Sequence, residues 1–226
     1  MVELYHPYYM IIKPKPLPAF LMKGALNFLS WFLKRRFNKL VIKEIDIKQN
    51  HSYLLMCNHF SFWDGFLAAY LSQHAIHKNQ KSHGFYIMVL KKQMQMNPWL
   101  KYFGCFSIVP GTPSVNKSLD YAAELLNKPG NLLILYPQGN LESNHVRKIV
   151  MKDGIDYIVP KINGNCQLIW SSNIVEYFES LKPSVYFHML DCGTNQTFDF
   201  AQVDNKINTF HQLSIQKQYR FTDEDY

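Results

Sequence analysis

Residues 53–65 of this chain read YLLMCNHFSFWDG, an apolar run followed at once by a polar and aromatic stretch. The run Tyr53–Cys57 has the length and the composition of a buried β-strand. The stretch after it therefore begins at the carboxyl end of a strand, where ligands bind in open α/β sheets. We expect functional side chains to lie on this loop.

Two residues of the loop suit acid–base chemistry. Ser61, with Asp64 three residues later, is typical of a capping box in which Ser61 is the N-cap of a helix and Asp64 its third residue. Asp64 then points back toward the helix start, where its carboxylate can reach the imidazole of His59. Such a pair fixes the tautomer of His59 and leaves the other ring nitrogen to accept a hydroxyl proton. A purely structural helix cap explains the same residues, so this pair alone does not decide the function.

The rest of the chain alternates between short apolar runs and stretches of helical periodicity. This alternation predicts an α/β domain with a largely parallel central sheet flanked by helices. Strand-length runs occur at Tyr53–Cys57, Phe85–Leu90, Cys105–Val109, Leu132–Tyr136, Tyr157–Val159, Gln167–Trp170 and Val185–Met189, and helical periodicity at Phe66–Gln73, Val115–Leu126, Ile174–Leu181 and Ile207–Gln216. We divide the chain into an N-terminal arm and interfacial helix at 1–40, an α/β domain at 41–216 and a polar tail at 217–226.

An amphipathic helix is expected before this domain. The proline-rich segment Lys13–Pro18 reads as an extended arm, and the stretch Phe20–Leu33 is rich in aromatic and aliphatic residues. Lys23 interrupts this stretch, and a transmembrane helix needs about 20 nearly uncharged residues, so we expect no membrane span. A cationic cluster follows at Lys34, Arg35, Arg36 and Lys39.

Apolar residues beside such a cluster are typical of a helix that lies in the interface of an anionic membrane. A core-packed helix, with basic residues favoured in its last turn by the helix dipole, is the alternative. We expect peripheral or monotopic association with the cytoplasmic face of a membrane.

The composition limits the class of partner. Hydrophobic residues make up 47% of the 226 residues, enough for a substantial core, and the formal net charge of +7 favours an anionic partner. The basic residues form no stripe and no recognition motif, so no nucleic-acid partner is expected. The four cysteines are scattered without a CxxC pair, and His145 and His188 lack partners at ligand spacing. We therefore expect neither a metal site nor a disulfide framework.

Four blocks along the chain carry a family resemblance. They are Asn58–Asp64, the glycine-led strand Gly104–Pro110, Tyr136–Asn140 after a buried strand, and Val159-Pro160 at the end of a short apolar run. Their order resembles the lysophospholipid and 1-acylglycerol-phosphate O-acyltransferase family, whose motifs read Asn-His-x-Ser-x-x-Asp, Gly-x-Ile-Phe-x-x-Arg, Phe-Pro-Glu-Gly-Thr-Arg and Val-Pro. The resemblance covers about residues 53–161, half of the chain.

The resemblance implies acyl transfer from a thioester, either acyl-CoA or acyl-carrier protein, to a hydroxyl of a lysophospholipid or monoacylglycerol-phosphate. His59 would be the general base, oriented by Asp64, with no covalent acyl-enzyme, no metal and no cofactor besides the thioester co-substrate. Backbone N–H groups near the first block or the Pro-Gln-Gly loop would hold the oxyanion. The implied substrate-binding residues are Asn58, Ser61, Gly104, Pro137, Gln138, Gly139 and Asn140.

The chain departs from the family pattern at its expected arginines. Pro110 ends the second block, and Leu141 follows Asn140 in the third, where the family has arginines that help to hold an acceptor phosphate. Gln138 replaces the glutamate of the third block, so the side chain keeps its hydrogen-bonding capacity and loses its charge. Basic residues that can substitute for the arginines are Lys117, Arg147, Lys148 and Lys152, although a solvated basic face explains them equally well.

Two further functions stay open. The first is O-acylation of a phosphate-free hydroxyl, such as that of an N-acyl amino-acid lipid, which suits the missing arginines. The second belongs to a different class, a non-catalytic lipid-binding protein on an acyltransferase-like fold. The presence of both His59 and Asp64 favours an enzyme over this binding module.

Overall fold

The computed structural model describes residues 10–78, 82–178 and 180–218. Seven strands among these residues form one sheet. The strand order is β1-β7-β6-β2-β5-β3-β4. β6 and β7 are antiparallel, and every other neighbouring pair is parallel. The strands are β1 Leu40–Lys43, β2 Ser52–Cys57, β3 Gly84–Leu90, β4 Cys105–Ile108, β5 Asn131–Leu135, β6 Cys166–Glu176 and β7 Ser184–Thr194. The predicted α/β class with a largely parallel sheet is confirmed.

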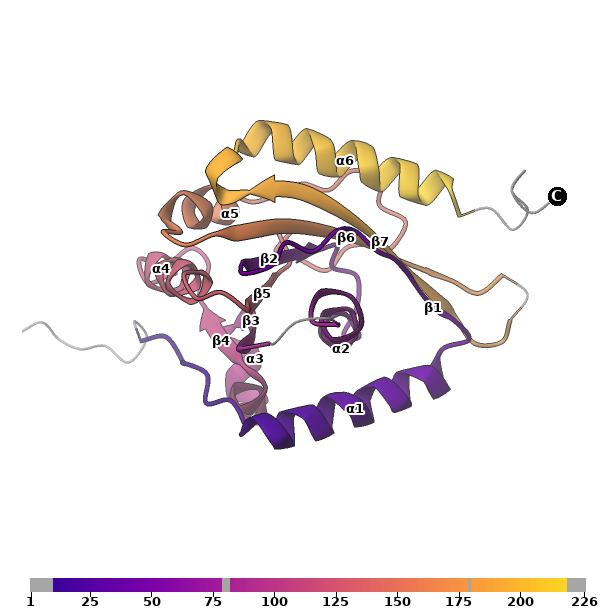
Figure 1. The fold of residues 1–226 in the computed structure, drawn as a ribbon, viewed down its shortest axis with the longest axis horizontal. Helices are drawn as coiled ribbons and strands as arrows, with labels where there is room; N and C mark the ends of the chain where they lie inside the picture. Colours follow the sequence, from indigo (N-terminus) through magenta and orange to yellow (C-terminus); the bar gives the residue numbers. More distant parts are fainter. Residues whose placement is uncertain (1–9, 79–81, 179, 219–226) are drawn as a thin grey trace, which may run out of the picture.

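Helices cover both faces of this sheet (Figure 1). One face carries α1 Ala19–Arg36, α2 Asp64–Leu71 and α3 Lys91–Met96, and the other carries α4 Val115–Leu126, α5 Gly154–Ile158 and α6 Phe200–Gln216. A π-helical turn at Ser72–Ile76 continues α2, and short 3₁₀ turns lie at Pro98–Phe103, Val159–Lys161 and Asn195–Thr197.

The core has two layers because side chains alternate along each strand. In β2, Leu54 and Met56 pack toward α4, α5 and α6, whereas Tyr53, Leu55 and Cys57 pack toward α1, α2 and α3. All six residues of β2 are buried, since helices cover both faces of the sheet there. The continuous apolar run in the sequence is therefore a central strand of the sheet.

Two predicted elements are wrong. Tyr157–Val159 is the end of α5 and the start of a 3₁₀ turn, because Ile155, Ile158 and Val159 are buried together at helical spacing. The helix predicted at Ile174–Leu181 is also wrong, since residues up to Glu176 extend β6 and pair with β7 along its length. Glu179, within that predicted helix, lies outside the described residues.

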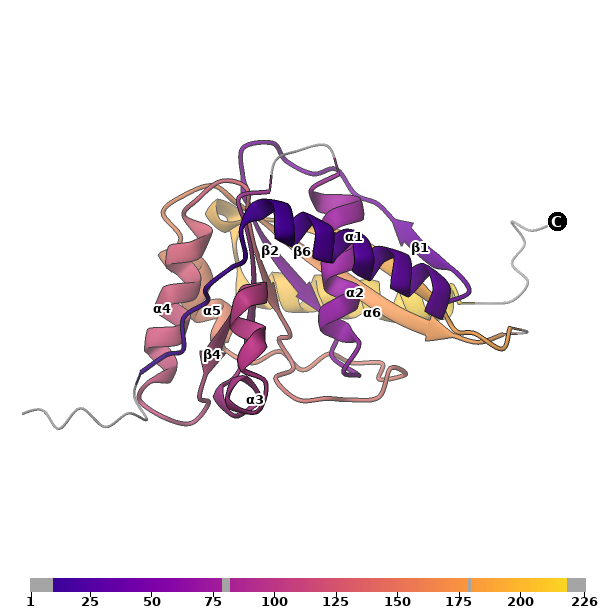
Figure 2. The same cartoon turned by 90° about the horizontal axis from the view of Figure 1, so that it is seen from below.

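The N-terminal helix is present as α1 and lies against α2 (Figure 2). Its Leu33 is buried, and the Ser30 hydroxyl lies 2.7 Å from Nε2 of His74. Before α1, the extended arm is held by the backbone bond from Lys15 N–H to the Lys101 carbonyl, at 2.8 Å. Residues 1–9 of the arm and 219–226 of the predicted polar tail lie outside the described residues.

Among the described residues, no helix combines the length and the hydropathy that a bilayer crossing needs.

Candidate active site

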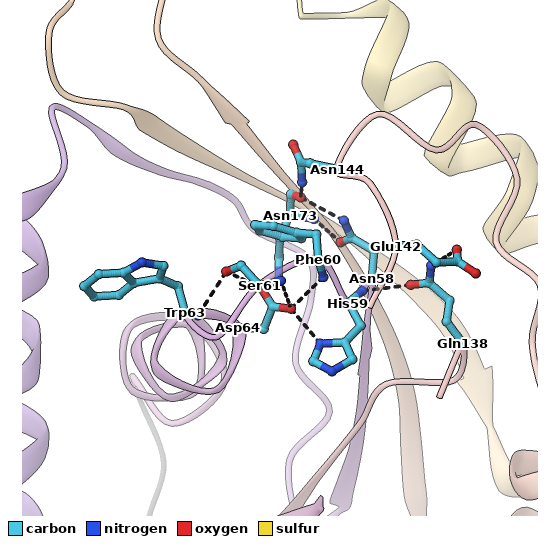
Figure 3. Close-up of polar contacts among 10 residues, drawn as sticks. All are labelled: Asn58, His59, Phe60, Ser61, Trp63, Asp64, Gln138, Glu142, Asn144 and Asn173. Carbon is cyan, nitrogen blue, oxygen red and sulfur yellow. Dashed lines mark hydrogen bonds and ion pairs between the residues drawn. The ribbon is translucent and has the colours of Figure 1, made fainter. Parts of the chain in front are cut away.

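The candidate site is built where β2 and β5 end side by side. These strands are parallel neighbours, with Met56 of β2 opposite Leu135 of β5. Their carboxyl ends therefore lie at the same edge of the sheet, and the loops that follow them meet. Figure 3 shows this meeting, with His59 and Asp64 among the residues of the first loop and with Gln138 and Glu142 from the second.

His59 and Asp64 are in direct contact. Nδ1 of His59 lies 2.7 Å from Oδ2 of Asp64 (Figure 3). An ionised carboxylate can only accept, so Nδ1 carries the proton in the neutral imidazole and Nε2 presents its lone pair. The His59 side chain is about a quarter exposed, at 27%, while that of Asp64 is buried. The expected contact between His59 and Asp64 is present, and it leaves Nε2 as a hydrogen-bond acceptor on a side chain that is partly exposed to solvent.

Asp64 also organises the backbone of the loop. Its Oδ2 accepts the N–H groups of Phe60, at 2.7 Å, and Ser61, at 2.9 Å, and its Oδ1 accepts the Ser61 hydroxyl at 3.3 Å. With the imidazole, this buried carboxylate therefore has four donors. Such saturation holds its charge without water and fixes its orientation toward His59.

The predicted capping box is present only in part. The helix begins at Asp64 and not directly after Ser61, and the Ser61 hydroxyl accepts the N–H of Trp63 at 2.9 Å. The carboxylate of Asp64 still reaches back to the Ser61 N–H, as in a capping box. The helix starts late because Asp64 draws the Phe60 and Ser61 N–H groups into a turn around its own side chain.

Gln138 and Glu142 connect the second loop to His59. Oε1 of Gln138 accepts the His59 N–H at 2.8 Å, and Nε2 of Gln138 donates to the carboxylate of Glu142. The Glu142 N–H in turn donates to the His59 carbonyl at 2.8 Å. Gln138 is 2% exposed, and both ends of its amide are bonded within the protein. It is placed to hold His59, and its amide is not offered to a ligand as a substrate-binding role would require.

Asn58 has a similar, fully occupied amide. Its Nδ2 donates to the Asn173 carbonyl at 3.0 Å, and its Oδ1 accepts the Asn173 N–H at 2.7 Å. Asn144 donates to the same carbonyl at 2.9 Å. These bonds join the end of β2 and the second loop to β6, so Asn58 fixes the backbone next to His59.

Tyr136, the first residue of the third block, lies under the imidazole. Its ring stacks on His59 with 4.4 Å between the ring centroids and 21° between the planes. Its hydroxyl is buried without a hydrogen-bond partner among the described residues, and burial raises the pKa of Tyr136 well above its usual value. The phenol therefore stays protonated and provides an aromatic surface.

Lys152 is the predicted basic residue that the fold brings to the third block. Gly139 has φ +67°, and a Cβ there would lie 2.8 Å from Nζ of Lys152, so glycine admits both the turn and the ammonium. The Lys152 N–H donates to the Pro137 carbonyl at 3.0 Å. Asn140, beside Gly139, is exposed. Lys117, in the first turn of α4, and Arg147 are exposed and have no hydrogen bond or ion pair to the described part of the loops.

Gly104 is not at the site, which corrects the sequence prediction. It precedes β4 and therefore lies at the amino end of that strand, while the site lies at the carboxyl ends of β2 and β5. Its φ is +82°, and a Cβ would lie 1.9 Å from the Phe85 carbonyl oxygen. The glycine is required because β3 and the start of β4 approach closely there.

Two members of the site were missed from the sequence. Glu142 lies in a polar stretch without any pattern that distinguishes it, and Tyr136 reads as the last residue of an apolar strand. Only Tyr136 had a signal, because it occupies the first position of the third block. Within the described residues, no group of three His, Cys, Asp or Glu side chains is arranged to hold a metal ion.

Comparison with known proteins agrees with this fold. A family model described as acyltransferase matches residues 39–170, more than half of the chain, and the chain belongs to this family. None of the curated proteins matches it significantly.

Among solved structures, the chain is similar to the 1-acyl-sn-glycerophosphate (LPA) acyltransferase PlsC from Thermotoga maritima. The TM-score is 0.57 at 15% sequence identity, and the match covers 88% of this chain and 82% of the other. At this identity the likeness establishes a shared fold.

Proposed function

We propose that this acyltransferase moves a fatty acyl group from a thioester to a hydroxyl of a lipid, with His59 as general base. The proposal rests on the 2.7 Å contact between Nδ1 of His59 and Oδ2 of Asp64, which leaves Nε2 as the proton acceptor. Nε2 takes the proton of the acceptor hydroxyl while the hydroxyl oxygen attacks the carbonyl carbon of the thioester. Collapse of the tetrahedral oxyanion breaks the C–S bond, and the imidazolium returns the proton to the thiolate.

This step requires no acyl-enzyme, metal or further cofactor. Asp64 stabilises the imidazolium that forms when Nε2 is protonated, because its buried charge lies against Nδ1. The thioester donor is acyl-CoA or acyl-carrier protein. Because both carry the same reacting group, the chemistry at His59 is common to them.

The acceptor that we favour is a lysophospholipid or monoacylglycerol-phosphate, with Lys152 holding its phosphate. The ammonium of Lys152 lies beside Gly139, in the loop whose Gln138 contacts His59. It has no ion-pair partner among the described residues. Ammonium groups bind phosphate as point charges. A phosphate-free acceptor is the second candidate, because Pro110 and Leu141 are exposed where the family has arginines.

Membrane association is proposed through α1. Its outer surface exposes Phe20, Phe28 and Trp31, the last two at 65% and 50%. The guanidinium of Arg35 lies over Trp31, 4.6 Å from the ring centroid, so cations and aromatic rings are interleaved. Such a surface suits an interfacial helix on the anionic, cytoplasmic face of a membrane.

This surface adjoins the catalytic loop. Trp63, the residue before Asp64, stacks on Phe32 of α1 with 6.1 Å between the ring centroids, and Phe37 packs edge-on against it. A membrane bound to α1 would therefore bring lipid acceptors close to His59.

The decisive experiment incubates purified protein in lipid vesicles with acyl-CoA or acyl-carrier protein and a panel of hydroxy-lipids. Thiol release measures turnover, and mass spectrometry identifies the acylated product. Acylation that requires His59 supports the proposal, and the preferred acceptor separates the phosphate lipid from the phosphate-free one. Lipid binding without any thiol release would show a binding module instead.

A further inference from the structure

The backbone of His59 is held from both sides by one loop. Its N–H donates to Oε1 of Gln138 and its carbonyl accepts the N–H of Glu142, each at 2.8 Å. These partners lie 79 and 83 positions further along the chain, since 138 − 59 = 79 and 142 − 59 = 83. The position of His59 therefore depends on the loop after β5 as well as on its own loop (Figure 3).

The two neighbours of Gln138 require one orientation of its amide. The His59 N–H can only donate, so it must face the amide oxygen. The carboxylate of Glu142 can only accept, so it must face the amide nitrogen. Position 138 thus needs an acceptor at one end and a donor at the other, which glutamine supplies and an ionised glutamate does not.

The burial of Gln138 makes this requirement strict. With 2% of the residue exposed, water does not replace a lost partner, and an unsatisfied buried polar group is costly. Glutamate at position 138 would also place a second carboxylate against Glu142, and like charges at this distance resist joint ionisation. The same chemistry works in the reverse order, with a carboxylate at 138 and an amide at 142.

We propose that Gln138 and Glu142 form a positioning pair for His59, in which one member must be an amide and the other a carboxylate or amide. This inference rests on the proposed function of His59 as the base, and it concerns residues that act through His59. It also accounts for glutamine at the position where the family motif has glutamate, because a carboxylate there would face the carboxylate of Glu142.

Four proteins test the pair: the wild type, Gln138→Glu, Glu142→Gln and the double variant that carries both changes. We expect Gln138→Glu to lower kcat by roughly tenfold or more with little change in KM, because the base is displaced and the substrate contacts are not. Glu142→Gln should lower kcat less than Gln138→Glu does, since its amide oxygen still accepts from Gln138. The double variant should recover kcat to within about threefold of the Glu142→Gln protein. Glu124→Gln, an exposed change on α4, is the matched control for loss of a charge.

Hydrogen exchange of the His59 amide, measured by NMR, reports on its hydrogen bond to Gln138 independently of turnover. We expect Gln138→Glu to speed this exchange by roughly tenfold or more and the second substitution to restore protection. Equal protection in all four proteins, or a double variant no better than Gln138→Glu, would overturn the pairing. A wild type that transfers no acyl group would refute the proposed function, while hydrogen exchange would still decide the pairing.

Discussion

The imidazole of His59 lies on the ring of Tyr136, with 4.4 Å between the ring centroids and 21° between the planes. A stacked ring restrains the rotation of the imidazole, and its negative face favours the imidazolium that forms during proton transfer. The Tyr136 hydroxyl has no hydrogen-bond partner among the described residues, so Tyr136 interacts with His59 through its ring.

Tyr136→Leu should therefore lower kcat by roughly fivefold to thirtyfold, which corresponds to about 1–2 kcal/mol of stacking and cation–π stabilisation. Tyr136→Phe should retain wild-type kcat and unfold at the same or a higher temperature, because it removes an unpaired buried hydroxyl. Steady-state kinetics and thermal unfolding measure both variants. Equal losses in the two would mean that the stacked ring is unimportant.

Removal of the base should be the most severe change. His59→Ala should reduce kcat by about two to four orders of magnitude, the usual contribution of a positioned general base. Circular dichroism should show a folded protein, because the contacts of Asp64 with Phe60 and Ser61 remain. A folded His59→Ala protein with more than about a tenth of the wild-type rate contradicts the mechanism.

Asp64→Asn tests the orienting carboxylate separately. The amide oxygen can take the place of Oδ2, with the amide nitrogen facing the Ser61 hydroxyl at the place of Oδ1. The neutral amide carries no charge to stabilise the imidazolium. We expect a loss of kcat of about two orders of magnitude or more, together with lower stability of the loop. Steady-state kinetics measure this loss, and a folded Asp64→Asn protein with near-wild-type kcat would argue against the role.

Lys152 should determine affinity for a phosphate-bearing acceptor. Lys152→Ala should raise the KM for monoacylglycerol-phosphate by roughly tenfold to a hundredfold, because a charge-assisted hydrogen bond contributes about 1.5–3 kcal/mol. Lys117→Ala and Arg147→Ala are matched controls, since both residues are exposed and neither has a hydrogen bond or ion pair with the described residues of the Gly139 turn. If a phosphate-free lipid is acylated as well as the phosphate lipid and is insensitive to Lys152→Ala, the second acceptor class takes its place.

Charge reversal on α1 tests membrane docking. Changing Lys34, Arg35 and Arg36 to Glu should weaken sedimentation with anionic vesicles by one order of magnitude or more, as each cation contributes about 1 kcal/mol near such a surface. Binding of the wild type should fall with rising salt. The control changes Lys128, Lys206 and Lys217, which are exposed on other parts of the fold. Equal loss in both triple variants would place the docking surface elsewhere.

Buried histidines predict a loss of stability in acid. Burial lowers the pKa of His188 from 6.5 to about 4, with the nearby charges of Lys43 and Lys217 acting in the same direction. As the pH falls below 6.5, the unfolded chain takes up a proton that the native chain refuses until about pH 4. Stability should therefore decline across this window, by at most about 1.4 kcal/mol per pH unit for this residue. Urea unfolding from pH 7 to 4 measures the slope, which His188→Gln should reduce.

Local sequence patterns determined much of the fold and the contact between His59 and Asp64. The apolar run of β2 implied a buried strand, and the five-residue spacing of His59 and Asp64 let one loop bring them together. Helix α4 matches the predicted Val115–Leu126, because its amphipathic repeat is local. Where a local pattern was ambiguous, as at Tyr157–Val159, the prediction was wrong, since short apolar runs suit a strand or a buried helix turn equally.

Tertiary structure alone decided what supports His59. Parallel pairing of β2 and β5 places Gln138, Glu142 and the Tyr136 ring around it. It also places Gly104 against β3 and away from the site, and brings the ammonium of Lys152 to the Gly139 turn. The sequence by itself indicated the proposed base and its carboxylate, because those two residues are held in one short turn. The partners from the second loop depend on which strands are neighbours, and residues about 80 positions apart carry no local spacing that could reveal it.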